Sequence, residues 1–225
     1  MPTALVVGAS RGIGFEFARQ YQSAGWTVYA THRSEPDRLK LRDLGAHTLK
    51  LDVHEPADLR NVGWQLDGER VDVAVLNAGV YGPRNSTMLS PPTDEQFELV
   101  MRTNVLGPMR LVPLLAPLLA TAQGTLAFVS SRMGSITEAG ASYGMLYRVS
   151  KAAVNMVAKL AHNEYGRQGV RVLALHPGWV RTDMGGPNAD VDVVDSIAGM
   201  RRVIGDAAAY PGGGFFDWRG QPLAW

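Results

Sequence analysis

Two tyrosines and one lysine in the stretch "SYGMLYRVSKAA", residues 142–153, have the types and spacings that suit proton transfer. Tyr147 precedes Lys151 by four positions, so in a helix the phenol and the ammonium would lie one turn apart on one face. A phenol with a pKa of about 10 donates a proton readily near neutrality, and a neighbouring cation stabilises its phenolate. Tyr143 has no such lysine, and Gly144 predicts that regular helix begins only after it. We therefore assign the proton to Tyr147 and expect Tyr143 at the rim of a substrate pocket.

A glycine-rich loop near the N-terminus suits phosphate binding. It follows the apolar run at residues 4–8 with a Gly-x-x-x-Gly-x-Gly pattern and leads directly into a helical stretch. Glycines permit a tight turn, leave room for a pyrophosphate and let a helix N-terminus direct its N–H groups at the anion. Taken alone, such a cluster also fits a purely structural turn. The candidate residues are Gly8, Ser10, Arg11, Gly12, Ile13 and Gly14.

The end of the next apolar run, residues 27–32, bears on the choice of dinucleotide. An acidic residue there would bind a ribose 2′-hydroxyl and repel a 2′-phosphate, and "THR" at residues 31–33 contains none. Arg33 and Arg11 could clamp a phosphate by charge-assisted hydrogen bonds, although both arginines also fit an ordinary solvated surface. We predict NADP(H) as the preferred cofactor, with NAD(H) as the alternative.

Other strand ends supply further candidates for the dinucleotide site. Asp52 could contact the adenine, and capping of a helix that starts near Pro56 is the alternative. The main chain of Val180 and the hydroxyl of Thr182 could hold a nicotinamide carboxamide, although "HPG" before them also fits a simple turn. The remaining candidates are Val53, Asn77, Ala78, Gly79, Pro177 and Gly178.

Short apolar runs that alternate with helical patterns must position these residues. Continuous apolar strands between helices predict an α/β, doubly wound parallel sheet of Rossmann type, with helices on both faces. Ligands bind beyond the carboxyl ends of such strands, where the candidates lie. We expect one domain over residues 1–225. The expected strands lie within residues 4–8, 27–32, 47–53, 71–79, 124–131 and 169–178.

Composition excludes several other classes of protein. The formal net charge is only +1, so we expect no basic surface that binds nucleic acid. The chain has no cysteine and no His/Asp/Glu spacing typical of a metal site, so we expect no metal. The longest apolar stretch, residues 105–120, contains Arg110 and three prolines and is too short to span a bilayer, so we expect no membrane contact. With no basic leader at the N-terminus, these features favour a cytoplasmic location.

The ordered set of motifs closely resembles the classical short-chain dehydrogenase/reductase superfamily over essentially the whole chain. It comprises the glycine loop, Asn-Ala-Gly at 77–79, Asn104, Ser130-Ser131, Tyr147-x-x-x-Lys151 and Pro177-Gly178. The chain has only four lysines, so a chance Tyr-x-x-x-Lys match is uncommon. The stretches "SSRMGSI", "YRVSKAAVNM", "HPGWVRTDMGG" and "DWRGQPLAW" are most similar to the C-factor branch and its small carbonyl reductases.

This resemblance implies a catalytic tetrad of Asn104, Ser131, Tyr147 and Lys151. Tyr147 would protonate the carbonyl oxygen, and Lys151 would favour the phenolate and bind the nicotinamide ribose. Ser131 would orient the carbonyl, and Asn104 would hold a water that relays protons from the lysine. Three departures are visible: Val7 replaces the usual threonine, Leu76 replaces the first asparagine of Asn-Asn-Ala-Gly, and the interval from Ser131 to Tyr147 is longer. The longer interval leaves open whether Ser130 or Ser131 faces the substrate, and we choose Ser131.

Residues after Thr182 would form a short substrate lid at about 183–200. Candidate apolar walls of the pocket are Met133, Tyr143, Trp179 and Met184, for which core packing is an equal alternative. Hydrolysis is disfavoured, because neither serine lies in a G-x-S-x-G elbow and His176 reads as a turn residue.

We therefore expect an NADPH-dependent oxidoreductase that reduces a small or medium aldehyde or ketone. The alternative is an NAD(P)-binding signalling or regulatory protein of C-factor type with little or no turnover. The family also implies a homodimer or homotetramer through the helices that carry Asn104 and Tyr147.

Overall fold

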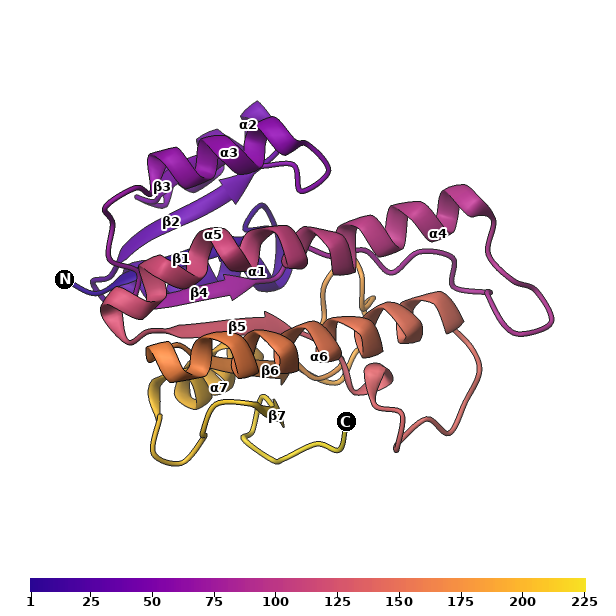
Figure 1. Cartoon of the computed structure of the whole chain (residues 1–225). Helices are drawn as coiled ribbons and strands as arrows, with labels where there is room; N and C mark the ends of the chain where they lie inside the picture. Colours follow the sequence, from indigo (N-terminus) through magenta and orange to yellow (C-terminus); the bar gives the residue numbers. More distant parts are fainter.

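In the computed structural model, which describes all 225 residues, seven parallel strands form one sheet in the order β3-β2-β1-β4-β5-β6-β7 (Figure 1). The order reverses between β1 and β4, which creates the switch point at which such sheets bind ligands. The predicted doubly wound α/β fold is confirmed. The strands are β1 (Thr3–Val7), β2 (Thr27–His32), β3 (His47–Lys50), β4 (Val73–Leu76), β5 (Thr125–Val129), β6 (Arg171–His176) and β7 (Gly214–Asp217).

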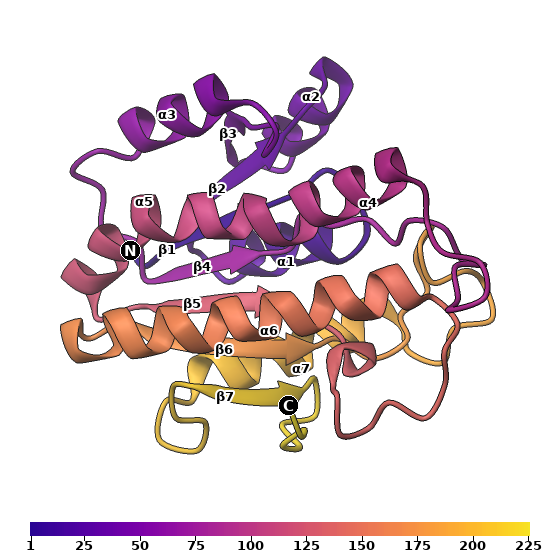
Figure 2. The same cartoon turned by 45° about the vertical axis from the view of Figure 1, so that its right-hand side comes forward.

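Helices cover both faces of the sheet (Figure 2). Residues of β1, β4 and β5 are all buried, which accounts for their continuous apolar sequences. One core cluster packs α3, α5 and α6 on one face, and a second packs α1, α2 and α7 on the other. The helices are α1 (Gly12–Ser23), α2 (Glu35–Asp43), α3 (Pro56–Gln65), α4 (Asp94–Met101), α5 (Gly107–Ala122), α6 (Met145–Tyr165) and α7 (Val193–Gly205).

A π-helix, η1 (Arg102–Leu106), joins α4 and α5 into one continuous helix. By length and mean hydropathy alone, this helix from Asp94 to Ala122 would suffice to cross a membrane, and it is longer than the sequence suggested. Leu111, Leu115 and Leu119 on one of its sides are buried in the core against the sheet. The helix therefore serves here as a layer of the fold.

The starts of two helices follow signals in the sequence. At α4, the Thr93 hydroxyl accepts from the backbone N–H of Gln96 while the Gln96 side chain accepts from the backbone N–H of Thr93, which forms a capping box. At α6, Gly144 has φ +63° and precedes the first helical residue, Met145. Helix thus begins after Tyr143, as predicted, and Tyr147 lies in its first turn.

The predicted lid at 183–200 is divided between two structures. Residues 183–192 form a loop, and from Val193 the chain forms α7. Ile197 and Met200 of α7 are fully buried in the core. Only the first ten residues of this segment are therefore free to act as a cover over the strand ends.

Candidate functional site

The candidate residues gather beyond the carboxyl ends of β1, β4, β5 and β6. There α4 and the start of α6 extend past the sheet, and long loops surround them (Figures 1 and 2). The sheet presents the glycine loop after β1, Asn77 after β4, Ser131 after β5 and Pro177 after β6. Residues far apart in sequence thus meet at one edge of the sheet.

Tyr147 and Lys151 lie one turn apart in α6 and face the end of β5. The Lys151 Nζ lies 5.6 Å from the centroid of the Tyr147 ring and donates to the carbonyl oxygen of Val129 at 2.9 Å. Lys151 is only 6% exposed. This burial lowers the pKa of its ammonium from 10.5 to about 8, because a charged amine loses hydration there.

Burial also raises the pKa of the Tyr147 phenol well above its ordinary value. The Ser131 hydroxyl interacts with the phenol and opposes this shift, and the neighbouring phenol of Tyr81 adds to it. Lys151 does not contribute to this pKa shift. The expected stabilisation of the phenolate by the ammonium is therefore absent in the protein without cofactor. Tyr147 is therefore a protonated donor near neutral pH.

The two serines after β5 point in different directions. Ser130 donates to Oδ1 of Asn155 inside the core. Ser131 faces Tyr147, and its Oγ accepts from the backbone N–H of Met133 at 3.1 Å. This geometry agrees with the choice of Ser131 as the serine on the substrate side.

Tyr81 is a residue of the site that the sequence did not indicate. Its ring stacks on that of Tyr147, with centroids 4.5 Å apart and planes 16° from parallel. Its hydroxyl lies 4.0 Å from the sulfur of Met133. Only its position two residues after Gly79 hinted that it would lie near the strand edge.

Asn104 lies in η1, and its side chain reaches the loop after β4. Its Nδ2 donates to the carbonyl oxygen of Val80 at 2.8 Å and to Oγ of Ser150 at 2.9 Å, and its Oδ1 accepts from the N–H of Val80 at 2.8 Å. Both amide donors are therefore used within the protein. A relay water would have to bind the second lone pair of Oδ1 or a backbone carbonyl of the π-turn.

The glycine loop forms a narrow cradle against the end of β4. Gly8 has φ +80°, and a Cβ on it would lie 2.7 Å from the Cα of Ala78. A Cβ on Gly14 would lie 2.0 Å from the carbonyl oxygen of Gly8, which also accepts from Nδ2 of Asn77 at 2.8 Å. Thr31 takes the place of the missing loop threonine, because its Oγ1 accepts from the N–H of Gly8 at 2.8 Å.

Backbone donors at this edge fit a bound dinucleotide. The N–H groups of Gly12, Ile13 and Gly14 open α1 and have no acceptor within the protein, as a pyrophosphate site requires. The N–H of Val180, a residue only 4% exposed, also lacks a partner and could serve the nicotinamide carboxamide. The Thr182 hydroxyl is already engaged, because it accepts from the N–H of Gly185 at 3.2 Å.

Exposed cations surround the outer end of the cradle. Arg33 is exposed and forms no ion pair, whereas Arg11 pairs with Asp183 of the lid loop at 3.2 Å. Lys40 of α2, which the sequence did not single out, donates to the carbonyl oxygen of Ser10 at 3.4 Å and lies over the ring of Phe15. These groups suit a 2′-phosphate, provided that Arg11 exchanges its partner.

Asp52 does not cap α3, which was the alternative role for it. The helix begins after Glu55 with no side-chain cap, and Oδ1 of Asp52 instead accepts from the N–H of His54 at 3.0 Å. The second carboxylate oxygen of Asp52 is left for a ligand. Val53 is buried against Gly107 at the start of α5, so its side chain is not exposed at the candidate adenine side.

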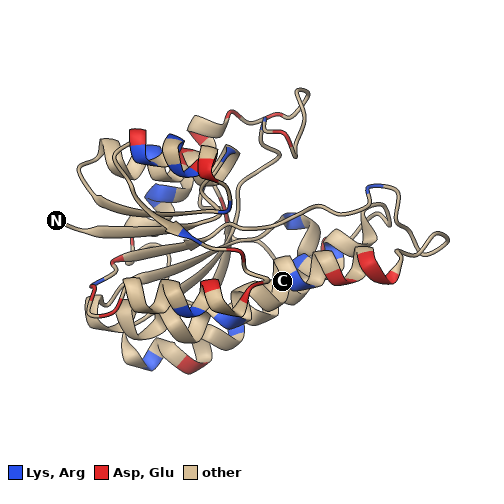
Figure 3. Ribbon diagram, turned by 90° about the horizontal axis from the view of Figure 1, so that it is seen from above, with Lys and Arg blue, Asp and Glu red and all other residues tan.

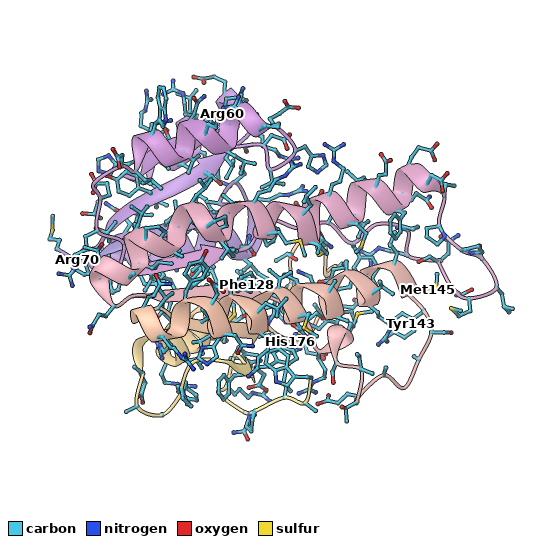
Figure 4. The ribbon with its side chains drawn as sticks, viewed as in Figure 1. Arg60, Arg70, Phe128, Tyr143, Met145 and His176 are labelled. Carbon is cyan, nitrogen blue, oxygen red and sulfur yellow. The ribbon has the colours of Figure 1, made fainter.

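The four candidate wall residues do not all lie in the core. Met133 is half-buried beside Tyr81, whereas Tyr143 is 57% exposed, two residues before α6 begins (Figure 4). Trp179 is largely exposed, and its Nε1 donates to the carbonyl oxygen of Gly185. Met184 is also exposed, on the lid loop.

No cluster of three His, Asp or Glu side chains could hold a metal ion. His176 at the end of β6 has its pKa lowered to about 4 by burial, with a further contribution from Arg132. It is a neutral ring near pH 7, and it lies at the end of β6 and not in the turn that the sequence suggested.

Comparison with known proteins matches residues 2–191 to the family described as short chain dehydrogenase. The chain is 39% identical over 161 residues to the "C-signal" of Myxococcus xanthus, a match that covers 69% of this chain and 93% of that protein. The structure of NADPH-bound carbonyl reductase from chicken fatty liver superimposes with a TM-score of 0.89 at 30% identity, covering 100% of this chain and 99% of the other. Carbonyl reductase Sniffer of D. melanogaster superimposes with a TM-score of 0.92 at 26% identity, over 100% of both chains.

Proposed function

Because the chain belongs to the short-chain dehydrogenase family, we propose that it is an NADPH-dependent reductase that converts a small or medium aldehyde or ketone to an alcohol. One observation carries this proposal. The phenol of Tyr147, the hydroxyl of Ser131 and the ammonium of Lys151 lie together at the carboxyl ends of the strands. The glycine cradle lies at the same end of the sheet. A purely structural nucleotide site has no need of that proton donor.

The protein's part in this reaction is to position the carbonyl and deliver one proton. The Ser131 hydroxyl and the Tyr147 phenol would both donate to the carbonyl oxygen, which orients it and stabilises the negative charge that develops there. The raised pKa of Tyr147 keeps the phenol protonated before the reaction. Lys151, which is mostly protonated at pH 7, would bind the ribose hydroxyls and steady the phenolate that remains.

NADPH, when bound, supplies the hydride that the carbonyl carbon accepts. The free N–H groups at the start of α1 would hold the pyrophosphate, and the N–H of Val180 would hold the carboxamide. Arg33, Lys40 and Arg11 would select the 2′-phosphate. The chicken reductase with bound NADPH supports this choice, and NAD(H) remains the alternative cofactor.

The test is oxidation of NADPH by the purified protein with a panel of activated aldehydes and ketones. Tyr147→Phe removes the proton donor and keeps the ring that stacks on Tyr81, so we expect turnover to fall by roughly 10²- to 10⁴-fold while NADPH binding, followed by its fluorescence, is retained. Tyr143→Phe is the matched control. It should keep most of the activity, because the Tyr143 phenol transfers no proton in this mechanism. Equal activity of Tyr147→Phe and the native protein would sink the assignment.

The similarity to the C-signal favours a second candidate, an NAD(P)-binding signalling or regulatory protein. Such a protein would use the same cradle and would not need the Tyr147 donor. Tight NADPH binding without turnover of any carbonyl in the panel would support it over the reductase.

The predicted homodimer or homotetramer also stays a proposal. Apolar side chains on α4, α5 and α6 are about half exposed, which supports packing against another copy through these helices. The side chains are Phe97, Leu99, Met109, Val149, Met156 and Leu160.

A further inference from the structure

Two arginines lie at the substrate side of the site without an acidic partner. Arg84 belongs to the loop between β4 and α4, and Arg148 belongs to the first turn of α6. Neither forms an ion pair, although the chain has eight ion pairs and several involve exposed arginines. Elsewhere, charged helices carry both signs interspersed (Figure 3).

Both guanidinium groups are held in place by aromatic rings and backbone carbonyls. The Cζ of Arg84 lies 4.8 Å from the centroid of Tyr81, and its Nη2 donates to the carbonyl oxygen of Met184 at 2.6 Å. The Cζ of Arg148 lies 4.9 Å from the centroid of Tyr143, and its Nε donates to the carbonyl oxygen of that residue at 3.0 Å. These contacts orient the cations and leave several N–H donors of each fork unused.

The two cations flank one aromatic side chain beside the reacting position. Arg84 lies over the ring of Tyr81, and Arg148 lies over the ring of Tyr143, whose neighbour Gly144 is close to the Tyr81 hydroxyl. The ring of Tyr81 stacks directly on Tyr147. The N-terminal end of α6 adds partial positive charge, and its first turn contains no acidic residue to offset it. Positive charge is thus concentrated next to Tyr147, and the ring of Tyr81 lies between Tyr147 and the guanidinium of Arg84.

We propose that Arg84 and Arg148 form an anion subsite, so that the preferred carbonyl substrate carries a carboxylate or phosphate group a few bonds from its carbonyl carbon. This inference rests on the proposed reductase activity and names the substrate class for it. The carbonyl would meet Tyr147 and Ser131, the body of the substrate would lie along Tyr81 and Met133, and the anion would pair with the two forks. The bond of Arg84 to Met184 also places the lid loop beside the bound anion.

The test compares each anionic substrate with an uncharged analogue of similar shape. The carboxylate pair is 4-carboxybenzaldehyde and its methyl ester, and the phosphate pair is 4-formylphenyl phosphate and its dimethyl ester. We expect kcat/KM to favour the anion by roughly tenfold or more at low ionic strength, mainly through KM, and the preference to shrink with added salt. The pair with the larger preference identifies the anion as a carboxylate or a phosphate.

Variants then assign the preference to these two residues. Arg84→Gln and Arg148→Gln should each lower the ratio of anionic to neutral kcat/KM several-fold, and the double variant should bring it close to one. Arg84→Lys keeps the charge and should restore part of the ratio. Arg167→Gln, an exposed arginine beyond the far end of α6, is the matched control and should leave the ratio unchanged.

The outcomes separate this inference from the activity on which it rests. Turnover with no preference for either anion, or a preference that survives in the double variant, would overturn the anion subsite and leave the reductase intact. Failure to turn over any carbonyl, neutral or charged, would overturn the proposed function and the subsite with it. NADPH binding is measured in every variant, so that a loss of cofactor cannot imitate a loss of substrate.

Discussion

The two ends of the candidate site are built in opposite ways. At the end with the proposed proton donor, Lys151 is 6% exposed and Asn104 is 1% exposed, and each is held by partners inside the protein. At the end proposed to select the cofactor, the side chain of Arg11 is 75% exposed, and Arg33 is exposed as well. Proton transfer requires fixed positions and perturbed pKa values, which burial supplies, whereas recognition of a phosphate requires only charge within reach. The buried arrangement leaves the ammonium of Lys151 with little hydration, which costs free energy of folding.

The largest expected effect lies at the buried end. Lys151→Met removes the ammonium and keeps an apolar stem of similar length, so activity should fall by roughly 10²-fold or more. The same change should stabilise the free protein, because a buried ammonium with a lowered pKa opposes folding. Activity and thermal unfolding of the same preparations measure the two effects, and a simultaneous loss of both would contradict the contrast between catalysis and stability.

The pH dependence of stability sharpens this prediction. The pKa of Lys151 is about 8 in the folded protein and 10.5 ordinarily, so between these values the unfolded chain binds a proton that the folded chain has released. The free energy of unfolding of the native protein should therefore increase as the pH rises from about 8 to 10.5. The difference between native protein and Lys151→Met should shrink over this range, and urea unfolding at several pH values measures it.

A smaller effect is expected in the cradle between the two ends. Gly14→Ala would place a Cβ 2.0 Å from the carbonyl oxygen of Gly8, a backbone atom that cannot move aside cheaply. We expect NADPH affinity to weaken by about 2 kcal/mol, or roughly 30-fold, as measured by fluorescence titration. Gly205→Ala is the control, since a Cβ there meets nothing within 4 Å. Unaltered binding by Gly14→Ala would mean that the phosphate does not approach this loop.

The smallest effect is expected at the exposed end. Arg33→Ala and Lys40→Ala should each raise the KM for NADPH about tenfold, the value of one charge-assisted hydrogen bond of about 1.5 kcal/mol. The KM for NADH should stay nearly constant, because NADH lacks the 2′-phosphate. Arg60→Ala on α3 is the matched control. A native protein that prefers NADH would remove the basis of this prediction.

The sequence predicted what depends on local pattern and chain order. The parallel fold, the family and the start of α6 after Gly144 follow from apolar runs, glycine and short-range spacing. Tyr81 and Lys40 were not predictable, because their roles arise from contacts with Tyr147 and Ser10 on other elements. Propensity also cannot show a π-turn or the partners that use both amide donors of Asn104.

The π-turn around Asn104 has a consequence for how relatives of this protein can diverge. A π-turn holds about one residue more than an α-turn, so η1 resets the helical register between α5, which packs on the sheet, and α4, which extends past it. Changes of length or sequence in α4 need not rotate the core face of α5. The exposed side of α4 can therefore vary among relatives while the core face of α5 keeps its register, whereas Val100, buried beside Gly82, ties α4 to the neighbouring loop.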